Sequence, residues 1–477
     1  MHMHMRRPRN HPRRTATALA AAVVSAVVLT AVPASAAIGG PGVGDPYFPD
    51  DGNPGYDVSH YDVRIAYDPA HTDRLDGDTT VTARALADLD RFGLDLKGFT
   101  VSSVVVNGAP AKEFSRAGAH KLVITPARPV AKGTTFTVRV RYAGSPDAEG
   151  WHTLASGGAY VTGEPHSATS WYPANDHPSD KATFALTATV PDGWTVVGNG
   201  LPGPESVEDG RRTFRWFEDK PMVTYASTVD IDRFTVHRGK TAAGTSVITA
   251  YSPDAVIDPA AEAQQTEILD FLTTKFGPYP FSSAGAIVVG AEKDPTNEPG
   301  ALETQSRPTY HTMIFDGSVV HENAHQWFGD SVSFKDWRDG CAAECFAQYA
   351  WQLWREHKGA DADGDYRSEV EDYRDDPSLW SVKLYDPGPG RELEPALKGS
   401  LMLHALRRTV GDEAFFRTLR TWTHDHAYGN ASFRQFEALA AKVSGKDLKG
   451  FFAAWVDGTV IPPEKYLYPG SLGRAAG

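Results

Sequence analysis

Residues 319–351 read VVHENAHQWFGDSVSFKDWRDGCAAECFAQYAW, and the rest of the chain is best interpreted outward from them. His321 and His325 are four residues apart, so on a helix their imidazoles share one face, one turn apart. Two imidazoles placed in this way can bind one Zn²⁺ at about 2.0–2.1 Å. Glu344 follows on a second predicted helix, which can pack beside the first and supply a third ligand. Two histidines and one glutamate leave a fourth position open for water, as in catalytic zinc sites.

Glu322 lies beside His321 and can face a water molecule in that fourth position, where it would act as a general base. The alternative is a surface helix that carries two solvent-facing histidines. The flanks Val319-Val320 and Trp327-Phe328 oppose this alternative because they make the helix largely buried. Buried imidazoles need polar partners, and a metal ion is one. We therefore predict one catalytic Zn²⁺ per chain.

Length and composition limit the class of protein. At 477 residues the chain is long enough for about three domains. Hydrophobic residues make up 41% and charged residues 22%, a mixture that can bury a sizeable core. The net charge of −13 argues against a general nucleic-acid binder, which needs a basic face. Two cysteines are too few for a disulfide-rich scaffold.

The first 36 residues are typical of a secretory signal. They contain five arginines, then an apolar stretch over residues 16–32, then the small residues Ala34-Ser35-Ala36 at a potential cleavage site. The apolar run is shorter than the ~20 residues of a membrane-spanning helix. We expect a secreted, extracellular chain with no stable membrane insertion after signal removal. An uncleaved anchor is the alternative, and Arg13-Arg14 leaves export by a twin-arginine route open.

Hydrophobic periodicity divides the remaining chain. Alternation with period two from about residue 44 to 232 predicts a large antiparallel β domain. Near residue 240 the pattern changes: Asp258-Pro259 is a helix start, residues 286–289 form a buried strand, and the last 110 residues are mostly helical. We predict a multidomain α+β chain with a signal peptide (1–36), an amino-terminal β domain (37–236), a zinc catalytic domain (237–358) and its helical continuation (359–477).

At this point the sequence resembles the gluzincin zinc aminopeptidases, relatives of aminopeptidase N and leukotriene hydrolase, and looks like a short, secreted bacterial-type member. Gly300-Ala301-Leu302-Glu303-Thr304 is similar to the family's Gly-x-Met-Glu-Asn motif. The other matching segments are residues 171–184, 321–330, 337–339, 344–347 and 398–407. The resemblance implies a saddle-like β domain followed by a thermolysin-like α/β domain with a helical continuation.

The resemblance also implies roles in substrate binding. Glu303 would bind the free α-amino group of a peptide, with Glu164 as a second anchor and Ala301 as a further substrate contact. A protonated amine taken out of water needs paired negative charge, so two carboxylates would select an amino terminus. A surface carboxylate in a turn is the alternative interpretation of Glu303. Asp330 and Asp339 are candidates for orienting the zinc-binding histidines.

Three positions depart from the family pattern. Thr304 replaces an asparagine, which would remove one amide near the substrate. Cys341 and Cys345 flank Glu344; we expect two packed thiols, with a disulfide or an occasional metal contact as alternatives. Ala396 stands where the family keeps a tyrosine that stabilises the oxyanion, a loss that typically costs ~10²–10³ in rate. Tyr385, eleven residues earlier, is a weak candidate to replace it.

The expected function is removal of amino-terminal residues from peptides with a free amino terminus, by a monomer that binds no nucleic acid. The missing tyrosine motivates one alternative, a zinc-retaining homologue of low or no activity that acts as a peptide-binding module. A thermolysin-like metalloendopeptidase is a second, which Glu303 opposes. Epoxide hydrolysis is a third and rests on the family resemblance alone.

Overall fold

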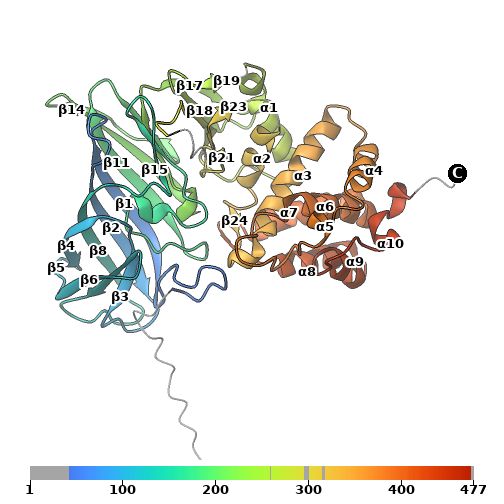
Figure 1. The fold of residues 1–477 in the computed structure, drawn as a ribbon, viewed down its shortest axis with the longest axis horizontal. Coiled ribbons are helices and arrows are strands. Elements are labelled where there is room, and N and C mark those ends of the chain that lie inside the picture. The colour runs from blue at the N-terminus through green and yellow to red at the C-terminus, as the bar shows by residue number, and fades with distance from the viewer. Residues whose placement is uncertain (1–41, 258, 295–299, 314–316, 474–477) are drawn as a thin grey trace, which may run out of the picture. The chain divides into compact units, whose positions relative to one another are not determined.

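The computed structural model describes residues 42–257, 259–294, 300–313 and 317–473. Strands dominate the chain up to residue 257, and helices dominate the part that follows (Figure 1). This order confirms the predicted α+β class. The predicted signal segment and the predicted helix N-cap Asp258 lie outside the described residues. The domain boundaries at 236/237 and 358/359 stay predictions.

A nine-stranded sheet forms the centre of the amino-terminal part, in the order β13-β15-β11-β1-β2-β8-β4-β5 with β14 beside β15. Its strands are β1 (Tyr56–Tyr67), β2 (Leu75–Ala85), β4 (Thr100–Val106), β5 (Ala109–Pro110), β8 (Thr135–Gly144), β11 (Lys181–Pro191), β13 (Leu201–Pro202), β14 (Ser206–Glu208) and β15 (Arg211–Val223). Every second residue of β11 is buried, which explains the period-two pattern of its sequence.

The pairs in this sheet are antiparallel, as predicted, except that β1 and β11 run parallel. More than one hundred residues separate these two strands in sequence, which is long enough for the crossover that a parallel pair requires. Two smaller sheets complete this part. They are β12 (Thr195–Gly198), β16 (Val229–Asp232), β10 (Ala159–Val161) and β9 (Trp151–Thr153), and β3 (Phe92–Asp95), β7 (Lys121–Thr125) and β6 (Glu113–Ala117).

The next part is built on a five-stranded sheet in the order β17-β18-β20-β22-β21. Its strands are β17 (Thr235–Lys240), β18 (Ser246–Tyr251), β20 (Ser283–Val288), β22 (Thr309–Tyr310) and β21 (Ala301–Leu302). All six residues of β20 are buried, which matches the predicted buried strand. Helix α1 (Pro259–Phe276) connects β18 to β20, and two short pairs lie outside the sheet, β19 (Val256–Ile257) with β23 (Thr312–Met313) and β24 (Val332–Ser333) with β25 (Gly429–Asn430).

Two helices carry the residues quoted at the outset. Helix α2 (Ser318–His325) ends at His325, and the chain turns shortly afterwards at Gly329, which has a φ of 118°. A short 3₁₀ turn over Trp337–Asp339 then leads into α3 (Cys341–His357). Phe328 and Phe346 stack with their ring centroids 4.6 Å apart and hold α3 against the end of α2. This contact sets the distance between the two halves of the predicted metal site.

The remaining chain is helical, as predicted. It forms α4 (Ala362–Asp372), α5 (Pro377–Trp380), α6 (Ala396–Val410), α7 (Asp412–Asp425), α8 (Phe433–Ser444), α9 (Lys449–Trp455) and α10 (Glu464–Leu467). Within the described ranges, none of the helices combines the length and apolar character that crossing a lipid bilayer would require.

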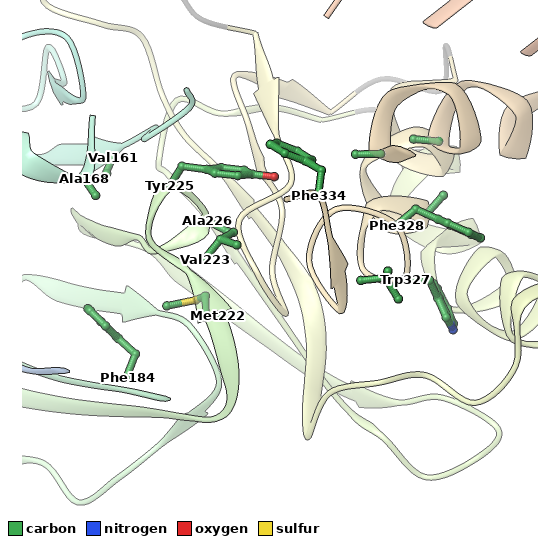
Figure 2. Packing of buried hydrophobic residues seen from close by; sticks show 14 of the residues in the cluster. Val161, Ala168, Phe184, Met222, Val223, Tyr225, Ala226, Trp327, Phe328 and Phe334 are labelled. Atoms are coloured by element: carbon green, nitrogen blue, oxygen red, sulfur yellow. The ribbon is translucent and has the colours of Figure 1, made fainter. Parts of the chain in front are cut away.

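One continuous hydrophobic cluster joins the strands to the helices. Figure 2 shows Phe184 and Met222 of the large sheet on one side and Trp327 and Phe328 on the other, with Tyr225 between them. The β-rich part is therefore packed directly against the helices that carry the predicted metal ligands.

Cys341 and Cys345 form a disulfide across one turn of α3, so the expectation of two packed thiols was wrong. Residues four apart on a helix share a face, and here their Cα atoms are 4.8 Å apart, within the range that a disulfide spans. Gly399 of α6 lies directly against the two sulfur atoms, and a Cβ atom at residue 399 would overlap the Cys345 sulfur. The glycine thus allows α6 to pack against the disulfide.

We expect Gly399→Ala to lower the free energy of unfolding by ~1–3 kcal/mol, because the added methyl group must push α6 away from α3. Urea unfolding followed by circular dichroism measures this change. Gly239→Ala is the matched control, since a Cβ atom there has no neighbour within 4 Å, and it should change the free energy by less than about 0.5 kcal/mol. Equal stability of both variants would contradict the packing described here.

Candidate metal centre and its carboxylates

Helix α2 brings the two histidines together. The Nε2 atoms of His321 and His325 lie 3.0 Å apart, as expected for residues one turn apart on the same face. Val319, Val320 and Ala324 of α2 are buried in the core, which fixes the rotation of the helix. The two imidazoles lie on the side of α2 that faces Glu344 of α3.

Helix α3 adds the third side chain. The two carboxylate oxygens of Glu344 lie 3.4 Å from His321 Nε2 and 3.4 Å from His325 Nε2. Ligands bound tetrahedrally at about 2.0–2.1 Å are separated from one another by about 3.3–3.4 Å. The three observed separations thus fit a single zinc ion, and the sequence prediction that these three residues converge agrees with the geometry.

The charge around the histidines also favours a cation. Burial by itself would lower the pKa of His321, but the Glu344 carboxylate and the nearby Glu322 outweigh burial and raise it to about 9. His325 is oriented through its other ring nitrogen, because Nδ1 lies 3.0 Å from the carbonyl oxygen of Phe328. An Nδ1–H donor at that position leaves Nε2 free to bind a metal.

Neither aspartate suggested from the sequence takes this orienting role. Asp339 accepts a hydrogen bond from the backbone N–H of Phe433 at 2.8 Å and so stabilises the start of α8. The carboxylate oxygens of Asp330 are buried and have no hydrogen-bond partner among the described residues. The nearby Lys181 ammonium donates to the backbone carbonyls of Asp330 and Ser331 instead, at 2.6 and 3.0 Å. The backbone carbonyl of Phe328, rather than an aspartate side chain, is therefore the group that orients His325.

Glu322 is buried beside the three converging side chains. Burial raises its pKa to about 7, with the carboxylates of Glu303 and Glu344 acting in the same direction against the two histidines. A cavity of about 320 Å³ is lined by Glu322, His321 and residues of both helices. Glu322 therefore has space for a reactant beside it and a proton affinity suited to proton exchange near neutral pH.

Glu303 and Glu164 come to the same place from distant parts of the chain. Carboxylate oxygens of Glu164, Glu303 and Glu344 lie within 4.8 Å of one another, and Glu303 lies equally close to Glu322 and His325. Burial, and then the charge of Glu303, hold the pKa of Glu164 well above its usual range. Glu303 is only 3% exposed, so the alternative of a surface carboxylate in a turn was wrong.

The backbone around Glu303 is fixed by Gln326, a residue that sequence reasoning did not single out. The Gln326 side chain accepts a hydrogen bond from the Ser306 N–H at 2.7 Å and reaches the Glu303 carbonyl at 3.5 Å. The position of Gln326 directly after His325 is the sequence signal that could have identified it. Ala301 lies in the edge strand β21, where it pairs with Tyr310.

Thr304 is turned away from the carboxylates. Its hydroxyl donates to the Arg307 carbonyl at 2.7 Å and lies 2.9 Å from the Thr309 hydroxyl. The residue is fully buried, so it stabilises the loop after Glu303.

The ring of Tyr385 packs against two arginine side chains. It lies under the guanidinium groups of Arg338 and Arg434, whose central carbons are 5.8 and 4.6 Å from the ring centroid. The charges that act on its hydroxyl come from these two arginines and from Asp336 and Asp339. Ala396, the position of the missing tyrosine, is the first residue of α6.

Comparison with known proteins agrees with this geometry. The peptidase M1 N-terminal domain matches residues 57–226, and the peptidase family M1 domain matches residues 301–455. A solved M1 zinc metallopeptidase from Deinococcus radiodurans is 30% identical, with a TM-score of 0.81, and the match covers 88% of this chain and 99% of that chain. This chain belongs to peptidase family M1.

Two further relatives of this M1 peptidase are informative. A mutant M1 zinc metallopeptidase from Deinococcus radiodurans, solved with a Tyr-Ser-Ala substrate, is 29% identical with a TM-score of 0.80, over 88% of this chain and 99% of that chain. Aminopeptidase N from Streptomyces lividans is 26% identical over 316 residues, which are 59% of this chain and 36% of that protein. The chain spans between 35% and 42% of the length of such curated relatives. The family and its solved zinc metallopeptidases imply one catalytic Zn²⁺, which the three converging side chains fit.

We expect the M1 peptidase to purify with one zinc per chain and His325→Ala to lose it, because two remaining ligands bind zinc far more weakly than three. Mass spectrometry of the metal content checks this directly. His424→Ala is the control, since the side chain of His424 is 86% exposed, and it should retain zinc. Full zinc occupancy in the His325 variant would show that the ion is held elsewhere.

Proposed function

We propose that this M1 peptidase is a secreted, monomeric zinc aminopeptidase that removes residues one at a time from the amino terminus of peptides. The observation that carries the proposal is the convergence of Glu164 and Glu303 on the centre formed by His321, His325 and Glu344. The name of aminopeptidase N and the peptide bound to the Deinococcus enzyme are consistent with it. The signal-like composition of the first 36 residues supports secretion.

Each group has a role that follows from its position. A bound Zn²⁺ would supply Lewis acidity, polarising the scissile carbonyl and activating a water molecule. Glu322 takes the proton of the attacking water and returns it to the leaving amine, which its pKa of about 7 suits. The backbone of edge strand β21 at Ala301 has room to pair with an extended substrate.

Two neighbouring carboxylates explain why the substrate would need a free amino terminus. Burial and repulsion by Glu303 disfavour the ionised form of Glu164, and a protonated amine between the two side chains relieves that repulsion. An internal peptide segment brings no positive charge and would leave the repulsion in place. This preference distinguishes the proposal from a metalloendopeptidase.

The proposal is tested by hydrolysis of a leucine chromogenic substrate, its N-acetyl counterpart and a chelator-treated sample. We expect cleavage only of the free-amine compound, dependent on zinc. Glu322→Gln should retain zinc and lose at least ~10²-fold in kcat, since it can no longer accept a proton. Full zinc content with no turnover in the native protein would favour a peptide-binding module, and equal cleavage of both compounds would favour an endopeptidase.

We expect Glu303→Gln to lower kcat/KM for the free-amine substrate by at least ~30-fold, because a desolvated ion pair with the amine is lost. Most of this loss should be in KM. Steady-state kinetics at several substrate concentrations separates the two parameters. An unchanged KM would remove Glu303 from the amine site.

Tyr385→Phe should leave kcat within about twofold of the native value. By contrast, the loss of a true oxyanion donor lowers kcat by ~10²–10³-fold. We expect the small effect because the ring of Tyr385 is already held by Arg338 and Arg434. The same chromogenic assay checks it. A large fall in kcat, with zinc retained, would make Tyr385 the substitute for the missing tyrosine.

A further inference from the structure

Tyr225 is a buried tyrosine whose hydroxyl has no evident structural role. It lies in the 3₁₀ turn Thr224–Ala226 that follows β15, and it is 1% exposed. Its hydroxyl finds no hydrogen-bond partner among the described residues. Buried hydroxyl groups are almost always hydrogen-bonded, so an unpartnered one calls for an explanation.

The backbone of Tyr225 lies between the two predicted amine anchors. A Cβ atom added to Gly163, the residue before Glu164, would be 2.6 Å from the Tyr225 carbonyl oxygen, so the two backbones are in contact. On the other side, the Ala226 carbonyl accepts a hydrogen bond from the Gln305 N–H at 3.0 Å. Gln305 is two residues after Glu303. The turn therefore fixes both glutamate-bearing segments.

The ring of Tyr225 packs against two aromatic side chains that follow α2 in the chain. It stacks on Phe334 with the centroids 6.4 Å apart and the planes 18° apart, and its centroid lies 5.9 Å from that of Trp337. Figure 2 shows the ring extending from the β-rich part toward Phe334, with the hydroxyl oxygen at its far end. The two aromatic contacts thus fix the direction of the hydroxyl.

The charges that act on this hydroxyl identify its neighbours. Burial, and then the charges of Glu303 and Glu164, hold the pKa of Tyr225 well above its usual range. The hydroxyl therefore stays protonated and can act as a hydrogen-bond donor. One carboxylate oxygen of Glu303, Oε1, is likewise buried and without a hydrogen-bond partner among the described residues. A donor and an acceptor, both unsatisfied, lie in the same buried region.

We propose that Tyr225 is a positioning residue for the amine site: its hydroxyl donates a hydrogen bond to a buried water that in turn donates to the Glu303 carboxylate, and this link holds the carboxylate in the orientation that receives the α-amino group. This inference rests on the proposed function of Glu303 as an amine anchor. It extends that function to a residue outside the metal-binding helices and outside every sequence motif described above.

The test measures binding without turnover. Zinc-loaded Glu322→Gln protein is titrated calorimetrically with leucine amide and with 4-methylpentanamide, which has the same side chain and amide but no amine. Adding Tyr225→Phe should weaken the binding of leucine amide by about tenfold and leave the binding of 4-methylpentanamide unchanged. Tyr172→Phe is the matched control, a fully buried tyrosine whose hydroxyl contacts Ser227, and it should change neither affinity.

A second arm distinguishes positioning from a structural effect. In a Glu303→Gln background, Tyr225→Phe should weaken the binding of leucine amide by less than about twofold, because both changes remove the same interaction. Three results would overturn the proposal. The first is an equal loss of affinity for both ligands, and the second is a tenfold loss that persists without Glu303. The third is a fall in kcat of the otherwise native enzyme with no change in its affinity for leucine amide. If the starting protein does not prefer leucine amide over 4-methylpentanamide, the amine site itself is wrong, and the inference falls with it.

Discussion

Four carboxyl side chains share one buried volume, and the cost of ionising them together governs what this centre can bind. Glu164, Glu303 and Glu344 approach within 4.8 Å of one another, and Glu322 lies equally close to Glu303. Such a cluster is costly in a low-dielectric interior unless positive charge enters it. A divalent metal ion fits between His321, His325 and Glu344, and under the proposed function the protonated amine of a substrate would be a second cation. Zinc binding and amine selectivity would then have one electrostatic origin.

Contacts from the surrounding scaffold hold these side chains together. Stacking of Phe328 on Phe346 fixes α2 against α3, and Gly399 lets α6 pack onto the disulfide beside Glu344. Gln326 fastens the loop of Glu303, while Lys181 from the large sheet binds the carbonyls just after α2. Each contact joins segments that are distant in sequence, so the repulsive cluster is preorganised by packing from several sides.

Under the proposed function, the centre would combine metal and amine ligands with a weakened means of stabilising the oxyanion. Ala396 has no polar side-chain group, and the ring of Tyr385 lies against two arginines. If no other group takes the place of the family's tyrosine, zinc and Glu322 would have to lower the barrier by themselves. We would then expect slow turnover rather than a changed specificity.

The fold class, the convergence of His321, His325 and Glu344, and the family could all be predicted from the residues alone. Periodicity and a four-residue spacing are local properties that a helix translates directly into geometry. Only the folded structure shows that Phe328 rather than Asp330 orients His325, that the two cysteines are joined, and that the turn of Tyr225 lies between the segments that carry Glu164 and Glu303. These features depend on how α3, α6 and the β-rich part pack, and such long-range packing leaves no periodic signal in the residues that take part.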